Sequence, residues 1–91
     1  MKKNRINITQ DKIDAALKTI GDKTQYRLNQ KGFGTFSSTH EILGILEEEF
    51  DELKDAIRSN IIKDISVELI DIAVACHFAL ACIDSESLDL L

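Results

Sequence analysis

The sequence predicts a small all-α protein, a helical bundle of about three helices that is completed by oligomerisation. The chain has 91 residues, no proline and only four glycines, so the residue that most often breaks a helix is absent. Apolar residues recur at helical spacing in three long segments. Hydrophobic residues make up 44% of the chain, yet a chain this short buries only a modest share of its surface alone. We therefore expect one domain, residues 1–91, that associates with further copies of itself.

The first helix is expected to begin near Thr9, whose hydroxyl suits an N-cap. Apolar residues at helical spacing follow, beginning with Ile13 and Leu17, and the pattern continues to about residue 28. A loop is expected over residues 29–37, where Gly32 and Gly34 give the backbone conformational freedom.

The second helix is expected to begin at Ser38 and to end near Arg58. Ser38 and Glu41 have the capping-box spacing, in which a hydroxyl and a carboxylate each satisfy a free backbone N–H. A turn follows, and the third helix is expected from about Ile62 to Ile83. This third segment is apolar around almost its whole circumference, which is typical of a buried helix.

Charge and hydropathy exclude several classes of partner. The net charge of −5 disfavours nucleic acid, because binding to it depends on Lys and Arg that neutralise phosphates. The third helix carries Glu68 and Asp71, and an acid near the centre of a spanning helix costs roughly 2.5–3.5 kcal/mol. We therefore expect no membrane span. The basic N-terminus is followed by no apolar run, so no signal peptide is expected, and the predicted location is cytoplasmic.

Two acids in the second helix lie beside its apolar face. Glu49 and Glu52 share a row with Ile45 and Ala56 on the flank of the apolar stripe. The other acids of this helix cover the opposite, solvated side: Glu47, Glu48, Asp51 and Asp55. Glu49 and Glu52 are therefore the candidates for a partly buried site, although a half-exposed helix surface is an equally good explanation for these two alone.

Glu68 and Asp71 stand three residues apart inside the apolar third helix, on one face of it. A buried carboxylate without a partner is costly, and no Lys or Arg follows Lys63 in the chain. We therefore expect a divalent cation to neutralise these acids. Four carboxylates from two helices are hard oxygen ligands, which suit Mg²⁺, with Mn²⁺ as the alternative ion.

These residues carry a resemblance to a known family. The stretches 46–57 and 67–72 contain Glu49-x-x-Glu52 and Glu68-x-x-Asp71. This arrangement resembles the E-x-x-E and E-x-x-D pattern of the MazG-like superfamily of all-α nucleoside triphosphate pyrophosphohydrolases. The resemblance covers the motif region, residues 38–83, which is about half of the chain.

The resemblance implies a homodimer or homotetramer with a MazG-like four-helix core. It also implies Mg²⁺-dependent hydrolysis of an NTP or dNTP to the monophosphate and pyrophosphate. The implied metal ligands are Glu49, Glu52, Glu68 and Asp71, and the implied catalytic group that orients or deprotonates water is Glu49 or Glu48.

The chain lacks the basic or amide side chain that family members often carry beyond E-x-x-D, since Ala75 and Phe78 occupy that stripe. The phosphate contacts are therefore expected from another subunit or from one of four cations: Lys63, Arg58, Arg27 and Lys31. Phe33 and Phe36 in the glycine-containing loop are candidates to stack on a nucleobase, with packing under the loop as the alternative. The alternative function is a non-catalytic helical interaction or regulatory module that has kept the fold.

Overall fold

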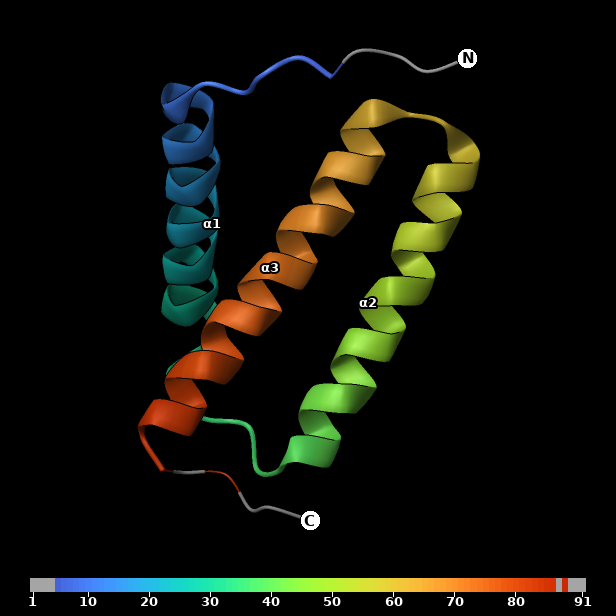
Figure 1. Cartoon of the computed structure of the whole chain (residues 1–91). Helices are drawn as coiled ribbons and strands as arrows, with labels where there is room; N and C mark the ends of the chain where they lie inside the picture. The colour runs from blue at the N-terminus through green and yellow to red at the C-terminus, as the bar shows by residue number, and fades with distance from the viewer. Residues whose placement is uncertain (1–4, 87, 89–91) are drawn as a thin grey trace.

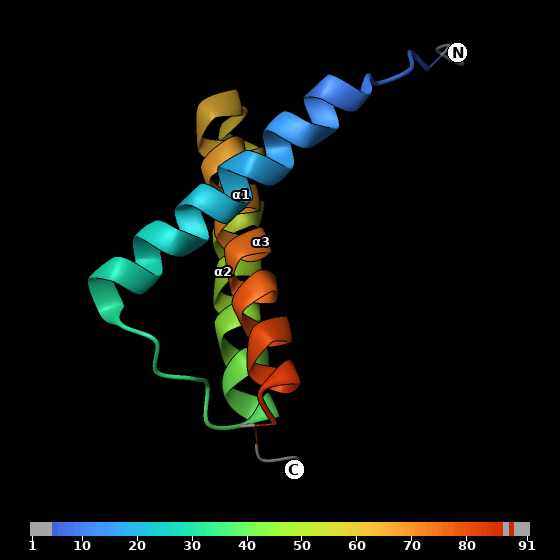
Figure 2. The same ribbon diagram turned by 90° about the vertical axis from the view of Figure 1, so that its left-hand side faces the viewer.

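A computed structural model describes residues 5–86 and 88, and this part of the chain is all-α, with no strand. It contains three helices: α1 (Gln10–Lys31), α2 (Thr39–Ser59) and α3 (Ile62–Asp84). Helices α2 and α3 form an antiparallel hairpin, and α3 lies between α2 and α1 (Figure 1). Figure 2 shows that α1 crosses this hairpin at a steep angle. The predicted all-α fold is thus confirmed, although α1 runs to residue 31, three residues beyond its expected end.

The helix ends follow from local hydrogen bonding. Thr9 caps α1 by accepting from the backbone N–H of Lys12, and Ser38 caps α2 by accepting from the N–H of Glu41 at 3.2 Å. The Glu41 carboxylate accepts from the N–H of Ser37 at 2.8 Å, one residue before the position that a capping box uses. Helix α1 ends at Gly32, whose φ of +87° lies in a region that L side chains rarely adopt.

The core is narrow because α1 and α2 contact only α3 and do not contact each other among the described residues. Small and medium apolar side chains fill it: Leu53, Ala56, Val74, Ala79 and Cys82. The loop before α2 closes one end of the hairpin. There the ring of Phe36 meets the ring of Phe78 edge to face, with centroids 5.1 Å apart.

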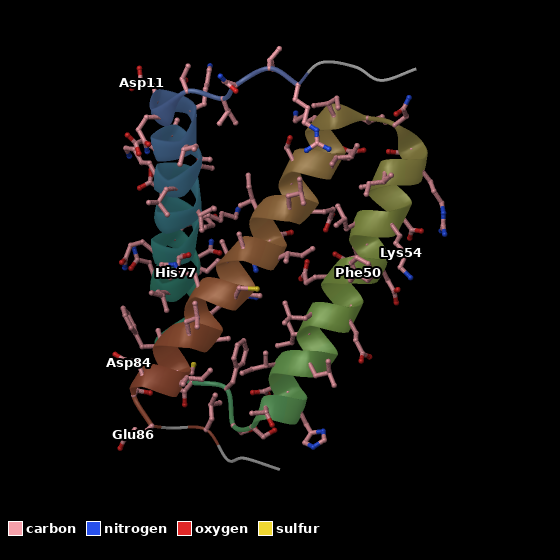
Figure 3. All side chains as sticks on the ribbon, viewed as in Figure 1. Asp11, Phe50, Lys54, His77, Asp84 and Glu86 are labelled. Atoms are coloured by element: carbon pink, nitrogen blue, oxygen red, sulfur yellow. The ribbon has the colours of Figure 1, made fainter. Side chains whose placement is uncertain are left out.

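Polar side chains hold α1 on α3. The buried Thr24 hydroxyl donates its one proton to the carbonyl of Ile20 at 2.9 Å. The hydroxyl oxygen therefore accepts the second hydrogen bond, which His77 Nδ1–H donates at 2.9 Å. His77 lies on the α1 side of α3 (Figure 3). The His77 side chain is exposed at the α1–α3 junction.

A single copy leaves much apolar surface uncovered, so the burial of α3, which we expect further copies of the chain to complete, remains a prediction. The accessible surface is 7475 Å², whereas a folded monomer of 10.2 kDa is expected to expose about 5300 Å². Exposed apolar residues recur three, seven or eleven residues apart and so share helix faces. They are Ile62, Leu69, Leu80 and Ile83 on α3, and Leu43, Phe50 and Ile57 on α2.

Helix α3 is also, by length and composition alone, apolar enough to cross a membrane, and 17% of its most apolar window is buried. Length and composition are weak evidence for a span, because the mostly buried core helix of a soluble protein and a signal sequence have them too. Its two acids face the other helices of this chain: Asp71 pairs with Arg27 of α1, and Glu68 lies beside Glu49 of α2. The expectation that α3 does not span a membrane remains a prediction.

We predict that the protein is a dimer or larger at micromolar concentration, because rows of large apolar side chains on α2 and α3 are exposed in a single copy and such surfaces mark interfaces. Leu69→Glu should shift the population towards monomer, since it places a charge in the middle of the exposed α3 stripe. Gln25→Glu, at an exposed polar position of α1, is the matched control and should leave assembly unchanged. Sedimentation of the wild-type protein as a well-folded monomer would contradict the prediction.

Candidate metal centre

The hairpin brings together three of the four carboxylates predicted as metal ligands. Glu49 of α2 and Glu68 and Asp71 of α3 each offer one oxygen, and these atoms all lie within 4.8 Å of one another. All three side chains are half-buried. The three-residue spacing of Glu68 and Asp71 places both on the face of α3 that meets α2. We call Glu49, Glu68 and Asp71 the carboxylate triad.

Glu52, the fourth predicted ligand, lies at the edge of the triad. Its side chain is exposed, and its carboxyl group lies within hydrogen-bonding reach of Glu68. Glu48, predicted as an alternative catalytic group, is exposed and lines the cavity described below together with Glu49. The structure therefore brings both motif halves together, with Glu52 and Glu48 on two sides of the triad.

Crowding of acids disfavours their charged forms. Burial raises the pKa of the Glu68 carboxyl, and a hydrogen bond and charge from Glu52 and the charges of Asp71 and Glu49 add to this. Burial also raises the pKa of Glu49, helped mainly by the charges of Glu52 and Asp71 and opposed by Arg27. The triad thus carries more negative charge than its surroundings offset.

Two buried oxygens of the triad, Glu49 Oε2 and Glu68 Oε2, have no hydrogen-bond partner. A buried acceptor without a partner costs about 1–3 kcal/mol, and a divalent cation would satisfy both atoms. Carboxylate oxygens from two rigid helices are ligands that Mg²⁺ and Mn²⁺ accept. The donor set therefore fits a hard divalent cation.

One cation of the chain does reach the triad, which corrects the expectation that only a metal neutralises these acids. Arg27 Nη2 of α1 lies 2.9 Å from Asp71 Oδ1. The two residues are 44 positions apart, so no local pattern in the sequence indicated the pair. It forms because α1 folds back across α3.

A cavity of about 400 Å³ opens beside the triad, between the C-terminal half of α1, the loop before α2, and the hairpin. Its charged lining comprises three acids, Glu48, Glu49 and Asp71, and two cations of α1, Arg27 and Lys31, which we call the basic wall. Its apolar lining comprises Leu28, Ile45, Val74 and Ala75, together with Phe36 and Phe78, which we call the aromatic wall. A cavity with this size and mixture of walls suits a small ligand that has a charged end and an apolar end.

The predicted substrate contacts divide between the cavity and the outer surface. Lys31 lines the cavity, and so does Arg27. Lys63 and Arg58 lie outside it near the α2–α3 turn, and Arg58 pairs with the exposed Asp55. Phe33 is 69% exposed and does not line the cavity.

In place of Phe33, Phe36 contributes to the apolar wall, packed on Phe78. Sequence reasoning named both loop aromatics and could not choose between them. It placed Phe78 only on the stripe of α3 that extends the acids.

No family model, curated protein or solved structure matches this chain. The resemblance to the MazG-like superfamily therefore rests on the paired motifs alone.

The pKa shifts predict a pH dependence for the metal-free protein. The folded state holds the Glu68 proton more tightly than the unfolded chain, where the pKa is near 4.5. This contribution to stability is complete below that value and is lost as pH rises through the raised pKa of the folded state. In EDTA, the melting temperature should therefore fall less between about pH 4.5 and neutrality for Glu68→Gln than for the wild type.

Glu47→Gln removes an exposed acid from the same hairpin and is the control, which should follow the wild-type profile. Identical pH profiles for Glu68→Gln and the wild type would show that Glu68 is not held protonated by its neighbours.

Proposed function

We propose that this protein is a Mg²⁺-dependent nucleotide pyrophosphohydrolase, with Mn²⁺ as the alternative ion. It would convert an NTP or dNTP to the monophosphate and pyrophosphate, as a cytoplasmic homodimer or homotetramer. The observation that carries the proposal is the carboxylate triad at the side of a cavity that has both a basic wall and an aromatic wall. Binding of a nucleoside triphosphate with its metal requires carboxylates for the metal, cations for the phosphates and an apolar surface for the base, all close together.

The triad and Glu52 would hold the metal. Glu49, Glu68 and Asp71 already converge, and Glu52 needs only a side-chain rotation, because it lies beside Glu68 and is exposed. A bound Mg²⁺ supplies charge stabilisation and lowers the pKa of a water molecule. The triad lies on two helices, which hold its side chains in place, and its half-buried position limits their contact with bulk solvent.

The basic wall would hold the phosphates. Arg27 and Lys31 are one turn apart on α1 and both line the cavity. Each is able to donate charge-assisted hydrogen bonds to phosphate oxygens, which are stronger than neutral ones. The acids on the hairpin and the cations on α1 thus approach the phosphate chain from different helices.

Glu49 or Glu48 would accept a proton from the attacking water. The water oxygen bonds to the α-phosphorus, the bond to the oxygen that bridges the α- and β-phosphorus atoms breaks, and pyrophosphate leaves. Glu49 is half-buried and lines the cavity, so one of its carboxylate oxygens is placed to accept a proton from a water there. Glu48 is adjacent, exposed and on the cavity wall.

The aromatic wall would receive the base. Phe36 and Phe78 are held edge to face at 5.1 Å, and Val74 and Ala75 continue their surface along the cavity. Flat rings bury well against such a surface. The cavity volume of about 400 Å³ lies within the range of small-molecule sites.

We predict that Glu49→Gln and Glu52→Gln each reduce pyrophosphate release by about a hundredfold or more. Loss of a ligand removes charge stabilisation worth several kcal/mol, and each 1.36 kcal/mol changes the rate about tenfold. The measurement is pyrophosphate release from a panel of NTPs and dNTPs with Mg²⁺ or Mn²⁺.

Matched controls stand on the same helix. Asp51 and Asp55 have side chains 76% and 80% exposed and pair with Lys54 and Arg58, so Asp51→Asn and Asp55→Asn should retain most activity. Equal losses of activity in Asp51→Asn and Glu52→Gln would show that the site had been assigned to the wrong face of α2. If the wild type released no pyrophosphate from any nucleotide, the alternative function, a non-catalytic helical interaction module, would replace the enzyme.

A separate prediction concerns the basic wall. Lys31→Gln should raise KM about tenfold, since a hydrogen bond to a charged group contributes about 1.5–3 kcal/mol. Lys63→Gln makes the same change outside the cavity and should leave KM unaltered. If steady-state kinetics showed the larger effect for Lys63→Gln, the phosphates would bind near the α2–α3 turn instead.

A further inference from the structure

The ion pair between Arg27 and Asp71 differs from the other ion pairs of the described residues. Those others link residues three or four apart on one helix: Lys18–Asp22, Lys54–Asp51 and Arg58–Asp55. Arg27–Asp71 joins α1 to α3, and its acid is only 17% exposed. It is therefore the least hydrated of these pairs and the one with the strongest electrostatic effect.

Arg27 stands at the boundary between the two parts of the candidate site. Its guanidinium contacts a member of the carboxylate triad, and the same side chain, 37% exposed, lines the cavity with Lys31. A guanidinium carries five N–H donors, of which one contact, to Asp71, is formed here. The group is thus within reach of both a carboxylate and a ligand in the cavity.

We propose that Arg27 exchanges partners, pairing with Asp71 when no divalent cation is bound and with a phosphate of the ligand once a metal occupies Asp71. This inference rests on the proposed function, because it takes the triad as the metal site and the cavity as the phosphate site. Arg27 is then a positioning residue that couples occupation of the two sites.

Electrostatics gives the direction of the coupling. The Arg27 charge lies beside Asp71 and also acts on Glu49, so it opposes a second cation within the triad. A phosphate brings negative charge between the metal and the guanidinium, and this removes the opposition. The Arg27 charge therefore weakens the binding of the metal alone, whereas it strengthens the binding of the metal together with a phosphate.

The exchange requires only a side chain to move. Thr24, one turn before Arg27 on the same face of α1, is buried and hydrogen-bonded to His77 at 2.9 Å. This second contact keeps α1 on α3 after the Asp71 pair opens. The long arginine side chain can then turn towards the cavity while the helix stays in place.

The first arm of the test measures Mn²⁺ binding without nucleotide, by calorimetry or by electron paramagnetic resonance. Arg27→Gln should bind Mn²⁺ about tenfold more tightly than the wild type, because the opposing charge is gone. Lys18→Gln also removes one positive charge from α1, but about 13 Å along the helix, beyond the Debye length. It should bind Mn²⁺ within about twofold of the wild type.

The second arm measures binding of inorganic tripolyphosphate at saturating Mg²⁺, a probe that involves no base. Here Arg27→Gln should bind about tenfold or more weakly, because a charge-assisted contact is lost. Lys18→Gln should again match the wild type. Opposite signs in the two arms mark the exchange, since a merely structural role would weaken both.

Two results would overturn the proposal: Mn²⁺ affinity in Arg27→Gln at or below the wild-type value, or unchanged tripolyphosphate affinity. A measurement on the wild type alone guards against a variant that fails to fold. The ¹⁵N signal of Arg27 Nε should shift on addition of Mg²⁺ and shift again with tripolyphosphate, and a signal insensitive to Mg²⁺ contradicts the exchange. None of these readouts needs turnover, so failure of the proposed catalysis is detected separately, by the pyrophosphate assay.

Discussion

Repulsion among carboxylates that face each other across the α2–α3 hairpin is the constraint on which the rest of the structure depends. Packing of Leu53, Ala56 and Val74 brings the two helices together, and the same register brings Glu49 against Glu68 and Asp71. Burial and mutual charge then raise the pKa values of Glu49 and Glu68. The apolar packing therefore holds acids together that would separate in water, and a proton on Glu68 or the nearby charge of Arg27 reduces the cost.

Helix α1 supplies what the hairpin lacks. It brings Arg27 to Asp71 and Lys31 to the cavity, and the Thr24–His77 hydrogen bond fixes it in place. The loop that follows α1 brings Phe36 onto Phe78. An acidic hairpin thereby gains a basic wall and an aromatic wall. Large apolar side chains of α2 and α3 remain exposed in a single copy, and their burial by other copies of the chain is a prediction.

Much of this arrangement was predictable from local sequence. Absence of proline, helical spacing of apolar residues and the Ser38 cap predicted the three helices. Their C-terminal ends lie three residues beyond the expected position in α1 and one residue beyond it in α2 and α3. Helix-face arguments predicted that Glu49, Glu68 and Asp71 lie inward and that Asp51 and Asp55 lie outward, as they do, because these positions follow the 3.6-residue period. The same arguments placed Glu52 in the partly buried row and Glu48 on the solvated side, whereas Glu52 is exposed and Glu48 lines the cavity.

The sequence by itself determined the helices, their caps and the face of each helix that carries acids, because hydrogen bonds and side-chain neighbours within a helix are local. Only the tertiary structure decided that Arg27 meets Asp71, that Lys31 lines the cavity while Lys63 does not, and that Phe36 lines it while Phe33 does not. These outcomes depend on how α1 crosses α3. That crossing is set by contacts between residues more than 40 positions apart, such as Thr24 with His77, which no periodic pattern records.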